Sequence, residues 1–140
     1  MSIERTKMTE SLKELFVPEL KSLNFNGSFP HFRRTIGDKT NLLTFQFDRH
    51  GGGFIIEIAN FQGTKFKTNF GERIQINKLT AHDINDRKRI YPNILTEEKG
   101  TENWFRFDKI SFLPFRNKYD RLAKKLIKKL PIMKEYWNEI

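Results

Sequence analysis

The chain has 140 residues, with 26 Lys or Arg and 17 Asp or Glu, which gives a formal net charge of +9. This length predicts a single domain over residues 1–140, with a core rich in the 14 Phe because aromatic side chains bury large areas. The absence of Cys excludes disulfides and zinc–thiolate sites and fits a reducing compartment.

The N-terminal segment MSIERTKMTESLKELF lacks the apolar stretch of a secretory signal. No apolar run approaches the roughly 20 residues that a membrane span needs. We therefore expect a cytoplasmic protein that does not interact with membranes.

An amphipathic helix is predicted near the N-terminus by apolar residues at helical spacing. Ser11 and Glu14 would form a capping box if the helix began there. Pro18 lacks an N–H and crowds the preceding turn, so we expect a kink or two short helices. The apolar stripe consists of Leu12, Leu15, Phe16, Leu20 and Leu23.

The clearest strand pattern spans residues 41–61, where apolar and polar residues alternate on both sides of three glycines. It predicts a β-hairpin at the centre of an antiparallel sheet, with the glycines supplying the positive φ angles of the turn. The polar parity implies that one sheet face is at least partly wet. The apolar positions are Leu43, Phe45, Phe47, Phe54, Ile56 and Ile58, and the polar ones are Thr44, Gln46 and Asp48.

Weaker alternation predicts further strands, and polar segments with Gly or Pro predict loops. The strands are expected at residues 31–36, 73–79, 84–91 and 104–110, and the loops at residues 24–30 and 93–103.

The last third of the chain is predicted to be helical. Its stripe, the strongest in the chain, is ended by Pro131, which can begin a second helix. Helix, strands and then helices is the order of an α+β domain. We expect an antiparallel sheet of about 4–6 strands, built as a meander of hairpins and packed on one face by the N-terminal and C-terminal helices. The stripe consists of Tyr119, Leu122, Ala123, Leu126, Ile127 and Leu130.

Most of the net charge comes from residues 116–129, which hold seven basic residues and one acid. Lys124, Lys125 and Lys128 therefore form a candidate site for an anionic partner. The alternative is a plain solvated helix face. Repulsion between lysines four residues apart costs roughly 0.2–0.5 kcal/mol per pair, and the helix dipole returns about 0.3–1 kcal/mol per cation in the last turn.

A second candidate set is basic and aromatic and falls on the predicted strands. These side chains could stack on bases or clamp phosphates, or they could simply be polar strand positions with one Trp covering a helix. The set comprises Arg33, Arg34, Arg87, Arg89, Trp104 and Arg106.

Catalytic and metal-binding motifs are not apparent in the sequence. His82 lies beside Asp83 and Asp86, but a metal or general-base site needs further ligands, and His31 and His50 are isolated along the chain. The glycine run is followed by a strand rather than by the helix of a phosphate loop. We therefore expect no metal, no cofactor and no enzymatic activity.

The order of motifs resembles the DUF4304 group of small bacterial domains of unknown function, over nearly the whole chain. An acid followed by two tryptophans is frequent in that group, whereas this chain has Glu102, Trp104 and Phe105. The resemblance implies the fold and carries no established activity. The motifs are Leu23-Asn24-Phe25, Phe32-Arg33-Arg34, Leu43-Thr44-Phe45-Gln46, Asp86-Arg87-Lys88-Arg89 and Trp104-Phe105.

Two functional hypotheses follow from the charge. The first is a binding module that engages an acidic protein through a basic surface, and the second is a nucleic-acid-binding protein that makes non-specific phosphate contacts. A hydrolytic enzyme is a third alternative and would require a cleft with convergent titratable groups. The sequence does not distinguish a monomer from a homodimer.

Overall fold

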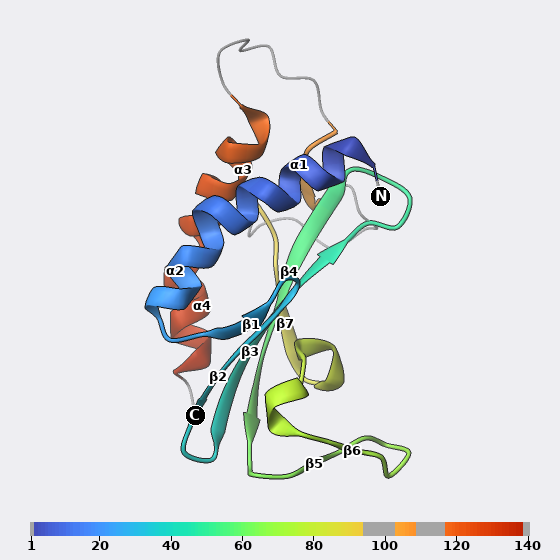
Figure 1. Cartoon of the computed structure of the whole chain (residues 1–140), viewed down its shortest axis with the longest axis vertical. Helices are drawn as coiled ribbons and strands as arrows, with labels where there is room; N and C mark the ends of the chain where they lie inside the picture. The colour runs from blue at the N-terminus through green and yellow to red at the C-terminus, as the bar shows by residue number, and fades with distance from the viewer. Residues whose placement is uncertain (1, 94–102, 109–116, 139–140) are drawn as a thin grey trace.

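The computed structural model describes residues 2–93, 103–108 and 117–138. It confirms the α+β class: an antiparallel sheet in the order β1-β2-β3-β4-β7 carries helices on one face, and β8 pairs with β4 (Figure 1). The strands of this sheet are β1 (Asn26–Ser28), β2 (His31–Ile36), β3 (Lys39–Phe47), β4 (Gly53–Gln62), β7 (Arg87–Ile90) and β8 (Phe105–Arg106). The helices are α1 (Ile3–Ser11), η1 (Leu12–Phe16), α2 (Val17–Ser22), α3 (Lys118–Ile127) and α4 (Leu130–Trp137).

The main core lies between the helices and one face of the β3–β4 hairpin. The alternating apolar positions of the hairpin are buried there, except for the half-buried Phe47, as the sequence predicts, against the stripes of the N-terminal and C-terminal helices. Fully burying one Leu, Ile or Phe side chain contributes about 1.5–3 kcal/mol. The core includes Met8, Leu12, Phe16, Leu20, Phe45, Phe54, Ile56, Ile58, Leu126, Met133 and Trp137.

The N-terminal helix begins earlier than the capping-box motif indicates. Ser2 is the N-cap, and its Oγ accepts a hydrogen bond from the backbone N–H of Arg5 at 3.1 Å. Ser11 lies inside the helix and instead donates to Asp120 Oδ1 of α3 at 2.7 Å. The capping box of Ser11 and Glu14 depended on the helix beginning at Ser11, and it does not form because Ser2 caps the helix nine residues upstream.

Pro18 does not split the N-terminal helix. The turn before it, η1, is a π-helix, in which the N–H of Val17 bonds the carbonyl of Leu12. Proline can neither donate to the carbonyl four residues earlier nor fit against it, and the wider π turn accommodates this mismatch. The helical run continues directly into α2, with Pro18 in its first turn.

The glycine run of the central hairpin serves close packing rather than positive φ angles. None of Gly51, Gly52 and Gly53 has a positive φ. A Cβ on Gly52 would lie 2.5 Å from Cβ of Asp108, and one on Gly53 would lie 2.7 Å from Nη1 of Arg106. The glycines therefore let β8 and the residues after it approach the start of β4.

The strand predicted at residues 31–36 is confirmed as β2, and the predictions at residues 73–79, 84–91 and 104–110 each contain a shorter strand within the described residues. Residues 73–79 contain only β6 (Arg73–Ile74), which pairs with β5 (Phe66–Lys67) and leads into the 3₁₀ turns η2 (Ile76–Lys78) and η3 (Ala81–Asp83). The expected loop at residues 24–30 contains β1. Residues 94–102 and 109–116 lie outside the described chain, and with them Glu102, Ile110, Arg116 and most of the second predicted loop.

Two asparagines fasten the end of α4 to the sheet. Asn60 Nδ2 donates to the carbonyl of Tyr136 at 2.9 Å, and Asn41 Nδ2 donates to the carbonyl of Trp137 at 3.2 Å. The last carbonyls of a helix have no partner within the helix. Side chains of β3 and β4 thus take the role of a C-terminal cap.

Asn41→Leu should destabilise the fold by about 3 kcal/mol, because buried groups that lose a partner cost about 1–3 kcal/mol each. Asn41 also accepts hydrogen bonds from Arg34 Nε and Nη2 at 3.0 and 2.8 Å, so several groups lose their partner together. Urea unfolding measures the change. Asn77→Leu at an exposed position is the control, and equal effects of the two substitutions would contradict the tether.

Candidate functional site

The sheet face that points away from the helices, the open face, carries two rows of polar side chains. Strand register places His31, Thr44, Glu57 and Arg89 side by side across β2, β3, β4 and β7. The next row contains Arg33 and Arg87 at its ends, with Leu42 and Ala59 between them. Side chains opposite one another in neighbouring strands are close enough to interact directly.

Glu57 is the centre of the first row, and it is completely buried at 0% exposure. Its Oε2 accepts a hydrogen bond from Arg87 Nε and lies 3.9 Å from Arg89 Nε. Its Oε1 lies 3.4 Å from Nδ1 of His82. A buried carboxylate without cationic partners costs several kcal/mol in lost hydration, and Arg87, hydrogen-bonded to Glu57, with Arg89 nearby supplies the offsetting positive charge.

The segment 79–84 lies across the open face and is held at three points. Arg33 Nε donates to the carbonyl of Leu79 at 2.9 Å, and Arg87 Nη1 donates to that of Ile84 at 2.8 Å. The N–H of Ala81 donates to Thr44 Oγ1 at 3.3 Å. Apolar contacts complete the cover in a second core of Leu42, Ala59, Leu79, Ala81 and Ile84.

The open face is therefore exposed to solvent only at its margins, and the expected exposure of this face is confirmed only there. Thr44, which belongs to the polar parity, is fully buried beneath the covering segment. Strand alternation shows that a residue points away from the helices. It does not show whether another segment covers that residue.

His31 and His82, far apart in sequence, are neighbours on the open face. Their ring centroids lie 6.1 Å apart, and His31 Nδ1 lies 3.0 Å from Thr44 Oγ1. Partial burial lowers the pKa of His31, and the positive charges of His82 and Arg33 lower it further. Within the described ranges, no three His, Cys, Asp or Glu residues converge as metal ligands.

Three adjoining hollows run along α3, the start of α4, β7 and β8. The first, of about 590 Å³, is lined by basic residues of α3 with Ile132. The second, of about 470 Å³, includes Trp104, Arg106, Arg121 and Lys125. The third, of about 300 Å³, includes Lys88, Arg89, Lys129 and Ile132. We call their cations the basic band: Lys88, Arg89, Arg106, Arg121, Lys124, Lys125, Lys128 and Lys129.

The structure brings six of the nine candidate residues to these hollows and leaves three elsewhere. Arg33 and Arg87 belong to the open face, and Arg34 lies over the ring of Phe25, 5.0 Å from its centroid. Trp104 lines the second hollow but is only 7% exposed. The residues at the hollows are Arg89, Trp104, Arg106, Lys124, Lys125 and Lys128.

Arg106 links the band to the end of the central hairpin. Its guanidinium contacts Asp108 Oδ2 at 2.6 Å and Asp48 Oδ2 at 3.3 Å. The hydrogen bond to Asp108 is the main cause that raises the pKa of Arg106, and it also lowers the pKa of Asp108. These pairs fix the guanidinium at the border of the second hollow.

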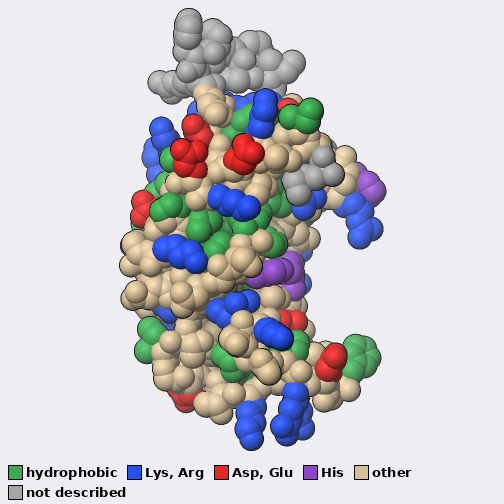
Figure 2. Space-filling view, viewed as in Figure 1, with side chains coloured by type: hydrophobic (Ala, Val, Ile, Leu, Met, Phe, Trp, Pro, Cys, Tyr) green, Lys and Arg blue, Asp and Glu red, His purple; other side chains and the backbone are tan. Residues whose placement is uncertain are grey.

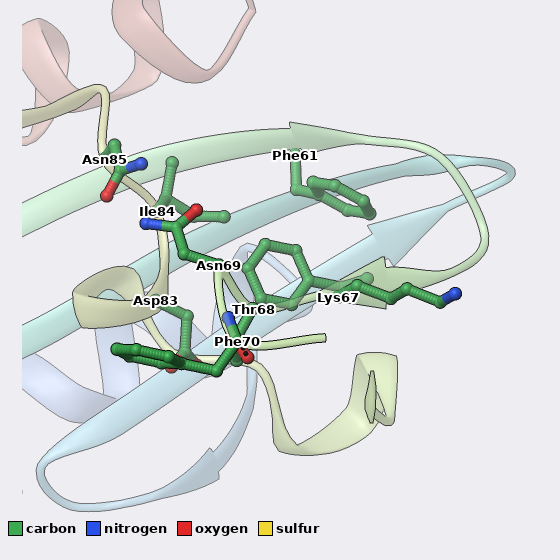
Figure 3. A pocket seen from close by; sticks show the side chains of 9 residues that line it. Phe61, Lys67, Thr68, Asn69, Phe70, Asp83, Ile84 and Asn85 are labelled. Atoms are coloured by element: carbon green, nitrogen blue, oxygen red, sulfur yellow. Dashed lines mark hydrogen bonds between the residues drawn. The ribbon is translucent and has the colours of Figure 1, made fainter. Parts of the chain in front are cut away.

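A separate pocket of about 430 Å³ lies between β5 and residues 83–85, on the same side of the sheet as the open face (Figure 3). Phe61, Phe66 and Phe70 line it together with polar side chains, and Phe70 is 97% exposed. The polar residues are Lys67, Thr68, Asn69, Asp83 and Asn85.

Sequence reasoning missed Glu57 and the pairing of the two histidines. A signal for Glu57 was present, since it is the one acid in the apolar run FIIEIANF, and a charge at the centre of a buried strand needs partners. The pairing of His31 with His82 depends on how the covering segment crosses the sheet. No local pattern encodes that crossing.

Comparison with family models gives one match, to the family described as Domain of unknown function (DUF4304), over residues 16–131. The chain belongs to this family. The match confirms the resemblance inferred from the order of motifs. No curated protein and no solved structure shows significant similarity to this DUF4304 chain. In the described part, no helix has both the length and the apolar character needed to cross a membrane.

The DUF4304 chain should lose stability on acidification partly through His31. The pKa of His31 is lowered from 6.5 in the folded state, so the unfolded chain binds the proton more readily, and stability falls as the pH drops below about 6.5. His31→Asn should therefore lose less stability than wild type between pH 7.5 and 5.5 in urea unfolding.

His50→Asn, at an exposed turn residue, is the matched control and should keep the pH dependence of the wild type. Equal acid sensitivity of the wild type and His31→Asn would contradict the assigned environment of His31.

Proposed function

We propose that this chain is a non-enzymatic binding module whose basic band holds an acidic segment of a partner protein. The observation that supports the proposal is the first hollow, where Arg121, Lys124, Lys125, Lys128 and Lys129 surround Ile132. No carboxylate is among the described residues that line the three hollows. A surface of one charge sign attracts the opposite charge and speeds association.

The apolar floor of the band favours a protein partner over nucleic acid. Ile132 lines two of the hollows, and Leu122 lines the third. An acidic peptide can place apolar side chains on such a floor while its carboxylates meet the surrounding cations. A phosphate backbone has no apolar group to place there.

The burial of Trp104 also favours a protein partner over nucleic acid. Sequence-independent binding of single strands relies on aromatic rings whose faces are open to bases. Trp104 is only 7% exposed, and its role as a stacking platform would require it to move out of its packed position. The nucleic-acid alternative therefore rests on charge alone.

The band can persist without a partner. Lys124 and Lys128, like Lys125 and Lys129, repel across one helical turn by roughly 0.2–0.5 kcal/mol per pair. The helix dipole offsets this by about 0.3–1 kcal/mol per cation near the C-terminal end. An acidic ligand would remove the remaining repulsion, which adds to its own attraction.

The double variant Lys124→Glu/Lys128→Glu should weaken binding of a labelled peptide with alternating Glu and Leu by about tenfold. Exposed ion pairs contribute about 0.2–1 kcal/mol each, and charge reversal replaces attraction by repulsion. Fluorescence anisotropy at 50 mM salt measures the affinity, and circular dichroism checks that both variants fold.

Lys65→Glu/Lys78→Glu is the matched control, because it changes the net charge equally at exposed positions away from the band. Equal losses in the two double variants would show that only net charge matters and would overturn the proposal. Tight, steeply salt-dependent binding of a mixed oligonucleotide without peptide binding would favour the nucleic-acid alternative.

A further inference from the structure

The molecule is concave on the side that bears the open face of the sheet (Figure 2). Figure 2 shows histidine side chains at the middle of this side, between the end of the β3–β4 hairpin and the β5–β6 segment. The rings of His31 and His82 lie 6.1 Å apart here. This region meets the basic band at Arg89, which lies near Glu57 and also lines the third hollow, but none of the residues lining the three hollows is a histidine.

Each of the two imidazoles has a polar neighbour at Nδ1. His82 Nδ1 faces Oε1 of Glu57 at 3.4 Å, and His31 Nδ1 faces Oγ1 of Thr44 at 3.0 Å. A partner at Nδ1 fixes the orientation of a histidine ring and leaves Nε2 for another ligand. The side chain of His82 is 40% exposed, so this second position can be reached from solvent.

The charges around the pair favour an anion. The charge of Arg33 acts on His31, and Asp83 acts on His31 with the opposite sign. Arg87 and Arg89 pair with Glu57, the acid that faces His82. The pKa of His31 is lowered in part by the charges of His82 and Arg33, which disfavour another cation at this position. An oxyanion between the rings would relieve this repulsion and accept hydrogen bonds from Nε2 of His31 and, when His82 is the imidazolium, from Nε2 of His82.

A pocket with aromatic surface is connected to the histidine pair through Asp83. Asp83 follows His82 in η3, its charge acts on His31, and it also lines the pocket of about 430 Å³ (Figure 3). Phe66 and Phe70 supply aromatic surface, and Asn69 and Asn85 supply amide donors and acceptors. A pocket of this volume that combines aromatic surface with polar groups can hold a small molecule.

We propose that the open face binds a nucleoside monophosphate, with its phosphate on His31 and His82 and its base in the pocket beside Phe70. The phosphate accepts hydrogen bonds from the two imidazoles near Arg33. The base stacks on aromatic surface, and its polar edge faces the asparagine amides. This site is independent of the proposed partner surface and can be present or absent whether or not the basic band binds a protein.

Nuclear magnetic resonance of the full chain tests the site by following the imidazole signals of His31, His82 and His50. Titration with AMP and UMP should shift the first two signals and leave His50, in the hairpin turn, unchanged. Inorganic phosphate and adenosine, tested separately, should each bind at least about tenfold more weakly than AMP, because each makes only part of the contacts.

Substitutions separate the two halves of the site. His82→Gln should weaken AMP binding about tenfold or more through loss of a charge-assisted hydrogen bond, and Phe70→Ala should weaken it about fivefold or more through lost stacking. His50→Gln and Ile36→Ala are the exposed controls. Phe70 is exposed, and His82→Gln keeps a donor for Glu57; the amide spectrum checks that both variants fold.

Three results would overturn the proposal. One is the absence of shifts at His31 and His82 with millimolar AMP, UMP, GMP and CMP. Another is equal affinity for AMP and inorganic phosphate, which would leave a phosphate site without a base pocket. The third is binding of a 5′-phosphorylated oligonucleotide without binding of any mononucleotide.

Discussion

The buried carboxylate of Glu57 is the constraint on which the arrangement of the open face depends. An ion of this kind loses several kcal/mol of hydration when it enters a protein interior, and only nearby cations and donors can offset that loss. Here they come from β7, through Arg87 and Arg89, and from η3, through His82. One side chain in the middle of β4 thus ties an edge strand and the covering segment to the sheet.

The same ion pairs decide which arginines are available for a partner. Arg87 is committed to Glu57 and to the carbonyl of Ile84, and Arg33 is committed to that of Leu79. Lys88, between Arg87 and Arg89, has the opposite strand parity and lines a hollow next to α4. β7 therefore contributes to two surfaces: Arg87 belongs to the open face, Lys88 to the basic band, and Arg89 to both.

The main fold could be predicted from the sequence because its signals are local and strong. Two-residue alternation around Phe45 and Ile56 and the helical stripe from Tyr119 to Leu130 each require one buried face, and both stripes meet in the main core. The lengths of β6 and β8 could not be predicted, since two-residue strands depend on partners rather than on periodicity.

The candidate site was only partly accessible to the same reasoning. The lysines of α3 could be assigned to an exposed face from helical spacing alone. The positions of Arg33, Arg34 and Arg87 could not be predicted in this way. Each of these side chains donates a hydrogen bond to a backbone carbonyl outside its own strand. The role of the glycine run was also misjudged, since its close neighbours Arg106 and Asp108 lie more than fifty residues later in the chain.

A double-mutant cycle between Glu57 and Arg87 tests most directly whether the buried carboxylate organises this face. Glu57→Gln, Arg87→Gln and the double variant are compared with the wild type by urea unfolding at pH 7.5. The account predicts that the free energy of unfolding falls less in the double variant than the two single losses added together, by at least about 1 kcal/mol. Each single change leaves a charged or polar partner unpaired, whereas the double change removes both partners. Additive losses, within about 0.5 kcal/mol, would contradict it.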